Sequence, residues 1–188
     1  MQKPIKKIVV IGPESTGKSV LCARLAAYYQ TVWGVEYARN YLLMHGKNYQ
    51  FSDLLTIAKG QIEVEERAIQ QASQLMPETN KEGLVFLDTN MYVMKVWCEY
   101  VFNQCHQFVL EEIANRHYDF YILCNVDLPW EADELREYPD EKPRRELFEI
   151  YKEILVNQPT PWVQVNGIGE ERILNAVNAI DEWLKATI

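Results

Sequence analysis

The chain has 188 residues, a net charge of −8 and a pI near 5.0. This length is typical of a single domain spanning 1–188, and a hydrophobic content of 48% is ample for a folded core. The acidic balance argues against a nucleic-acid partner, which needs clustered Lys and Arg, and favours a cationic or neutral small-molecule substrate. No run of about 18 apolar residues occurs, which argues against a membrane partner. Four cysteines without CxxC spacing and three scattered histidines argue against a zinc site and favour a cytoplasmic protein.

The first predicted elements are a buried strand over 5–11 and a helix over 18–29, joined by the octet GPESTGKS at 12–19. The octet has the phosphate-loop pattern, in which backbone N–H groups and a helix N-terminus face phosphates. Lys18 would reach the β- and γ-phosphates of ATP, and Ser19 would hold Mg²⁺. Glu14 is expected to point toward the waters of the metal or the acceptor crevice. The predicted nucleotide-binding residues are Gly12, Glu14, Ser15, Thr16, Gly17, Lys18, Ser19 and Val20.

A short strand over 31–35 and a helix over 36–45, ending at Gly46, come next. Strand ends line the ligand crevice of a doubly wound sheet, so Glu36, Tyr37 and Arg39 become candidate substrate residues. The alternative is an ordinary surface helix with an acid near its N-terminus. A long helix over 52–76 follows, with Ser52 as its expected N-cap.

A strand over 84–87 leads into Asp88, which could sit beside Mg²⁺ or accept a proton from an attacking hydroxyl. The alternative is an N-cap for the helix that follows. Either Asp88 or Glu36 could serve as general base. Helices over 91–102 and 108–116 and a strand over 120–124 come next. Tyr37, Tyr41, Tyr92 and Trp97 are aromatic residues near predicted strand ends, although most such rings belong to a core.

Residues 127–145 interrupt the alternation of predicted strands and helices with three prolines and many acids. We predict that they form a mobile lid. Arg136 and Arg144 are predicted to act on the transferring phosphoryl group, with Arg145 as a further candidate. Alternatively, these arginines only neutralise the neighbouring acids. A helix over 146–156, a strand over 162–165 and a helix over 170–185 complete an α/β fold. Its expected core is a mostly parallel, five-stranded sheet with helices on both faces.

Several segments together resemble one family, the nicotinamide riboside kinases that form the kinase domain of NadR-type bifunctional proteins. The loop GPESTGKS is similar to that family's phosphate loop, although it also resembles that of RecA-type recombinases. Further matches keep their order along the chain: EYAR at 36–39, FLDTN at 86–90, PWEADELR at 129–136 and RRE at 144–146. The departures are Asn90 in place of an aspartate, Glu134 in place of a glycine, and Val35 where a tryptophan is expected.

The resemblance implies a single-domain P-loop kinase with an adenylate-kinase-like lid. It implies transfer of the γ-phosphoryl of MgATP to the 5′-hydroxyl of nicotinamide riboside, with Asp88 and Asn90 among the substrate residues. Ser19 and Asp88 would be the metal residues. The chain lacks a His-x-Gly-His motif, so no adenylyl transfer is expected. The alternatives are a kinase of another nucleoside or small alcohol, and an ATP-binding regulatory module with little turnover. The sequence leaves open the base preference for ATP or GTP and whether the chain forms a homo-oligomer.

Overall fold

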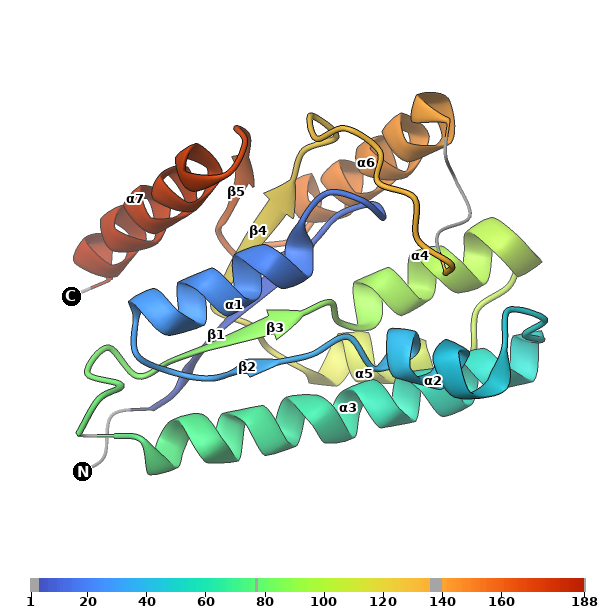
Figure 1. The fold of residues 1–188 in the computed structure, drawn as a ribbon. Coiled ribbons are helices and arrows are strands. Elements are labelled where there is room, and N and C mark those ends of the chain that lie inside the picture. Colours follow the sequence, from blue (N-terminus) through green and yellow to red (C-terminus); the bar gives the residue numbers. More distant parts are fainter. Residues whose placement is uncertain (1–3, 77, 136–139, 188) are drawn as a thin grey trace.

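The computed structural model describes residues 4–76, 78–135 and 140–187. Strands and helices alternate along most of these residues (Figure 1). In chain order they are β1 Lys6–Ile11, α1 Lys18–Tyr28, β2 Trp33–Gly34, α2 Tyr37–His45, α3 Phe51–Gln74, β3 Leu84–Asp88, α4 Met91–Phe102, α5 Gln107–Asn115, β4 Phe120–Cys124, α6 Glu141–Val156, β5 Trp162–Val165 and α7 Glu170–Ala186. Among them, no helix combines the length and the apolar character that crossing a bilayer requires.

The five strands form one parallel sheet, as predicted, and their order in it is β2-β3-β1-β4-β5. β1 is central, and its Val10 lies opposite Asp88 of β3 on one side and Ile122 of β4 on the other. The chain therefore leaves β1 toward one edge for β2 and β3 and toward the other edge for β4 and β5. Such a reversal opens a crevice at the carboxyl ends of the central strands, which is where ligands bind in open α/β sheets.

Both faces of the sheet are covered because successive side chains of each strand point to opposite sides. Ile8 and Val10 of β1 pack in a buried cluster with residues of α1 and α7, whereas Val9 and Ile11 pack with residues of α3 and α6. Figure 1 shows α1 and α7 together on one side of the sheet, with α3 on the other. Burying each such aliphatic side chain contributes about 1.5–3 kcal/mol, which makes the central strands a rigid base for the loops at their ends.

A third buried cluster lies where α2, α4 and α5 meet the first half of α3. It forms a wall beside the crevice, in which α2, α4 and α5 pack on α3, and α3 itself lies against β2 and β3. Its fully or nearly fully buried members are Ala38, Tyr41, Leu42, Leu54, Ile57, Ala58, Ile62, Met91, Met94, Cys98 and Val109.

Most element boundaries lie within two residues of the prediction, and three elements need comment. β2 is only two residues long. α3 begins at Phe51, and its N-terminus is held by Asp53, whose carboxylate accepts the Gln50 N–H at 2.7 Å, so the expectation of Ser52 as N-cap was wrong. α6 begins at Glu141 and not at 146, because a proline is tolerated in a first helical turn, where its missing N–H has no partner to lose. The predicted lid arginines at 144 and 145 therefore lie on a helix.

Candidate active site

The loop after β1 adopts a turn that only its two glycines allow. Gly12 has φ 143°, and a Cβ there would lie 2.9 Å from the carbonyl oxygen of Cys124 at the end of β4. Gly17 has φ 76°, and a Cβ there would lie 3.0 Å from Leu128. Gly17 is also the N-cap of α1 and has no side chain that could occupy the first N–H groups of the helix. The loop thus presents backbone donors and a positive helix end to an anion.

The loop side chains hold this turn in place. Thr16 is buried, and its hydroxyl donates to the Pro13 carbonyl at 2.7 Å. The ammonium of Lys18 donates to the same carbonyl at 3.0 Å, so it lies folded across the loop. Ser15 has φ 56°, a left-handed conformation, and its hydroxyl accepts the N–H of Glu131 at 3.2 Å. Val20, at the start of α1, is largely exposed and lines a cavity that opens beside the loop.

Asp88 ends β3 beside the loop and is fully buried. Its Oδ2 accepts the Ser19 hydroxyl at 2.5 Å, and its Oδ1 has no hydrogen-bond partner among the described residues. Burial first, and then the charge of Glu36, raise the pKa of Asp88 to about 7, against the opposing effects of Lys18 and Ser19. A buried carboxylate with one unused oxygen next to a serine hydroxyl suits a hard cation such as Mg²⁺, which prefers oxygen ligands. Asp88 does not cap α4, because Asn90 does.

The two residues after Asp88 fix its position. Thr89 is buried with φ 73°, an unusual conformation for a β-branched residue, and such strain gathers at functional sites. Asn90, predicted to contact substrate, accepts the Tyr92 N–H at 3.0 Å and donates to the Tyr121 hydroxyl at 3.0 Å. Asn90 lines a separate cavity of about 140 Å³ and caps α4, so the structure places it behind Asp88 and not in the main cavity.

The main cavity has a volume of about 410 Å³ and extends from the phosphate-binding loop to α2, α4 and α6. We call the part of the cavity that is lined by α2, α4, α6 and residues 133–135 the acceptor half. The walls of the acceptor half carry carboxylates and large rings together, and the principal residues are Glu36, Arg39, Trp97, Tyr100, Asp133 and Tyr151. Of the four aromatic residues singled out in the sequence, Trp97 lines this cavity. Its indole N–H donates to the Tyr49 hydroxyl at 3.0 Å, which fixes the ring.

Glu14 lies on the phosphate-binding loop, at the border with the acceptor half of this cavity. It lines the cavity with Glu36 and Tyr151, and burial together with the charges of Glu36 and Glu14 raises the pKa of Tyr151. The three side chains are therefore close enough to interact electrostatically. Glu36 is the N-cap residue of α2, so the positive end of that helix lies beside its carboxylate.

Tyr37 and Arg39 have different surroundings. The Tyr37 ring packs on α3 at Gly60, where a Cβ would come within 2.3 Å of it, and its N–H donates to the side chain of Gln61 at 2.8 Å. Tyr37 thus fastens α2 to α3. Arg39 lines the cavity, and its guanidinium pairs with Asp133 in two hydrogen bonds, of 2.8 and 3.3 Å.

The three arginines predicted to act on the phosphoryl group differ in their surroundings. Arg136 lies outside the described residues. Arg144 is buried on α6, its guanidinium lies 5.3 Å from the ring centroid of Trp130, and its Nε and Nη1 have no hydrogen-bond partner among the described residues. Arg145 instead pairs with Glu141 on the exposed side of the same helix, in agreement with the alternative of simple charge neutralisation.

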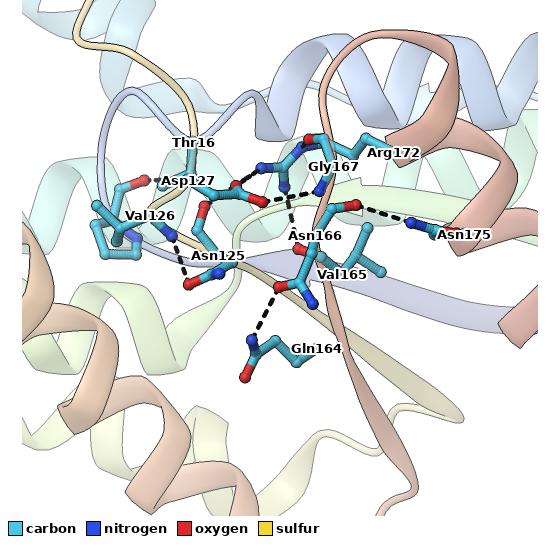
Figure 2. Close-up of polar contacts among 11 residues, drawn as sticks. Thr16, Asn125, Val126, Asp127, Gln164, Val165, Asn166, Gly167, Arg172 and Asn175 are labelled. Atoms are coloured by element: carbon cyan, nitrogen blue, oxygen red, sulfur yellow. Dashed lines mark hydrogen bonds and ion pairs between the residues drawn. The ribbon is translucent and has the colours of Figure 1, made fainter.

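A network that sequence reasoning missed fastens the loops after β4 and β5 beside the phosphate-binding loop. Figure 2 shows the buried Arg172 of α7 reaching Asp127, with which it forms an ion pair. Arg172 also donates to the Gly167 carbonyl at 2.9 Å, and the Gly167 N–H donates to Asp127 at 2.8 Å. Gln61 was missed as well: it donates to the Asp88 carbonyl at 3.3 Å. Neither residue lies in a motif, and only the packing of α7 and α3 reveals them.

These features define a P-loop α/β fold, in which a glycine-rich loop, a buried strand-end aspartate and a cavity adjoin. The chain belongs to the AAA domain family (AAA_28), whose model matches residues 7–172. It is 28% identical over 185 residues to the trifunctional NAD biosynthesis/regulator protein NadR of Escherichia coli K12, covering 96% of this chain and 43% of that protein. The predicted resemblance to NadR-type proteins is thereby confirmed, and the chain spans less than half the length of this relative.

Two solved structures share the fold. One is a NadR protein in complex with NR, with a TM-score of 0.78 and 24% identity over 96% of this chain and 50% of that chain. The other is thymidylate kinase from Ehrlichia chaffeensis, with a TM-score of 0.61 and 13% identity over 96% of this chain and 99% of that chain. The predicted α/β P-loop fold class is confirmed.

Proposed function

We propose that this chain is an ATP-dependent kinase that phosphorylates the 5′-hydroxyl of nicotinamide riboside. The observation that carries the proposal is one cavity in which the phosphate-binding loop and a wall of carboxylates and rings face each other. A small acceptor in that cavity would lie directly against the γ-phosphoryl of a bound nucleotide. The NadR structure in complex with NR, which shares this fold, supports the choice of acceptor.

The donor half would hold the triphosphate of ATP. The backbone N–H groups of residues 15–19 and the positive end of α1 would bind the phosphates, and Lys18 would leave the Pro13 carbonyl to reach them. Ser19 and Asp88 would hold Mg²⁺, which supplies charge neutralisation on the β- and γ-phosphate oxygens when bound. Arg144 would add a buried positive charge near the transferring group, since two of its nitrogens have no partner among the described residues.

The acceptor half would orient the 5′-hydroxyl and remove its proton. Asp88 and Glu36 are the two candidates for this role, and they interact electrostatically, since the charge of Glu36 contributes to the raised pKa of Asp88. A carboxylate with a pKa near 7 is well matched to proton transfer at neutral pH. If Asp88 holds the metal, it stays ionised and Glu36 remains as the base. Transfer then requires only that the hydroxyl oxygen lie in line with the γ-phosphorus.

The walls of the acceptor half match a pyridinium nucleoside in charge and in shape. Nicotinamide riboside carries one positive charge on a flat ring, which aromatic faces attract by about 0.5–2 kcal/mol. Trp97 and Tyr100 provide such faces, and Glu14 and Glu36 provide compensating negative charge. A neutral purine or pyrimidine nucleoside would gain less from this wall.

The test is turnover with MgATP and a panel of nucleosides, followed by mass measurement of the products. Nicotinamide riboside should gain one phosphate, and the Lys18→Ala variant should lose nearly all of this activity. A gain only on another nucleoside or a small alcohol would favour that alternative acceptor. ATP binding without any acceptor-dependent turnover would identify a regulatory module and refute the kinase proposal. Thermal shifts with ATP and with GTP would establish the preferred base.

A further inference from the structure

The segment between β4 and α6 is tied to three different parts of the cavity. We call residues 129–135 the crossing segment. The Glu131 N–H donates to Ser15 in the phosphate-binding loop, and the Trp130 ring lies against Arg144 of α6. The Asp133 carboxylate pairs with Arg39 of α2. The crossing segment thus joins the donor loop to the acceptor wall.

The contact with α2 is the best defined of the three. Asp133 Oδ2 accepts from Arg39 Nη2 at 2.8 Å and Asp133 Oδ1 from Nη1 at 3.3 Å, which is the two-pronged geometry that favours Arg over Lys. Asp133 Oδ1 also accepts the Leu135 N–H at 3.0 Å, so the carboxylate is fixed within its own segment. The Asp133 side chain is 20% exposed, and both partners line the cavity.

The charge of this pair matters for a cationic acceptor. Without Asp133, the guanidinium of Arg39 would keep only the weaker attraction of Glu36 and Glu134, and it would add positive charge to the wall of the acceptor half. Two like charges about 8 Å apart repel enough to weaken binding by roughly tenfold or more at the dielectric constant of a protein surface. With Asp133 in place, the Arg39–Asp133 pair is neutral, and Glu14 and Glu36 make the net charge of the wall negative.

We infer that Asp133 is a positioning and specificity residue of the acceptor site, which acts by holding and neutralising Arg39 so that the wall of the acceptor half accepts a cation. Arg39 then serves as a fastening for the crossing segment and not as a direct ligand of the acceptor. The inference rests on the proposed function for its cationic acceptor, while the fastening itself can be tested without any acceptor.

The kinetic test compares nicotinamide riboside with its carboxylate analogue, whose extra negative charge makes the base neutral overall. Asp133→Asn should raise KM for nicotinamide riboside about tenfold, raise KM for the analogue much less, and change kcat less than about twofold. Asp133→Glu should recover part of the loss. The double variant Arg39→Asp with Asp133→Arg, which exchanges the two charges, should have a KM for nicotinamide riboside closer to that of the wild type than either single variant has. The matched control is Glu170→Gln, which breaks the exposed ion pair with Arg24 between α7 and α1.

The fastening test uses hydrogen exchange of residues 129–135 in the protein without acceptor. Asp133→Asn should speed exchange in this segment by about tenfold, whereas the control variant Glu170→Gln should exchange like the wild type. Unchanged exchange, or equal KM increases for both acceptors, would overturn the inference. So would failure of the exchanged pair to recover activity in a protein that melts like the wild type, because Arg39 would then touch the acceptor. A wild-type protein inert toward nicotinamide riboside would refute the proposed function and the selection of a cation, while exchange would still decide whether the pair holds the crossing segment.

Discussion

Replacing Asp88 by Asn should stabilise the empty protein at pH 8 while it disables the site. The carboxylate is fully buried, and its pKa is raised from 3.8 to about 7. The folded state therefore binds this proton more tightly than the unfolded chain does. The contribution of Asp88 to stability is accordingly neutral below about pH 4, becomes unfavourable as the pH rises from about 4 to about 7, and is fully unfavourable above that.

The size of the effect follows from the same values. A pKa of about 7 against 3.8 corresponds to roughly 4 kcal/mol of unfavourable ionisation at pH 8. Asn keeps an oxygen for the Ser19 hydroxyl but places an N–H₂ group where Oδ1 has no partner among the described residues, at a cost of about 1–3 kcal/mol. The net gain of about 1–3 kcal/mol would raise the melting temperature by roughly 2–12 °C for a domain of this size.

The assay is thermal unfolding of wild type and Asp88→Asn from pH 5 to pH 8 without Mg²⁺ or nucleotide, with Asp119→Asn as control. Asp119 is an exposed carboxylate that accepts the Lys7 N–H far from the cavity, so this control should follow the wild type across the range. The advantage of Asp88→Asn should be present at pH 8 and vanish or reverse at pH 5. In turnover with MgATP, the same variant should lose at least about a hundredfold in kcat while ATP still binds. A variant that is less stable than wild type by the same amount at both pH values would refute the reasoning.

Two further substitutions test the supports of the site. Gly60→Ala should destabilise the protein by about 1–3 kcal/mol in thermal melts, because the new Cβ would lie 2.3 Å from the Tyr37 ring; the same change in a Tyr37→Ala background should cost much less, and an equal cost would rule out this clash. Arg172→Met should cost about 3–5 kcal/mol by leaving Asp127 and the Gly167 carbonyl without their partner. Arg24→Met, which removes an exposed ion pair, should cost less than about 1 kcal/mol, and equal losses in the two variants would contradict the importance of burial.

The strands, the helices and the phosphate-binding loop could be predicted because their signals are local. Apolar runs such as 84–87 and 120–124 identify buried strands, and the spacing of Gly12, Gly17 and Lys18 identifies the loop wherever a strand precedes it. Boundaries were less accurate where a competing local interaction decides them. At α3, the reciprocal bonding of Gln50 and Asp53 displaced the expected cap.

The acceptor half was only partly predictable, since it is assembled from residues far apart in the sequence. Glu36 and Trp97 were identified because they lie near strand ends. Tyr151 was not identified, since it is one apolar-looking position of α6 until that helix packs against the sheet. The partnership of Arg39 with Asp133 spans 94 positions of sequence, and each residue alone resembles an ordinary surface charge. Tyr37 is the opposite case. Its place in a motif predicted a contact with substrate, whereas its ring packs on Gly60 of α3.

Under the proposed function, the glutamate in the phosphate-binding loop would let one segment bind a nucleotide and also select an acceptor. A carboxylate directed at a triphosphate would be repelled, but Glu14 lines the cavity with Glu36 and Tyr151. An acceptor that already carries a phosphate would meet two carboxylates there, and each unit charge about 6 Å away would cost roughly 2–3 kcal/mol at a protein surface. A cation gains by the same amount. On the proposed function, the charge of Glu14 and Glu36 would favour a nucleoside over a nucleoside monophosphate as the acceptor.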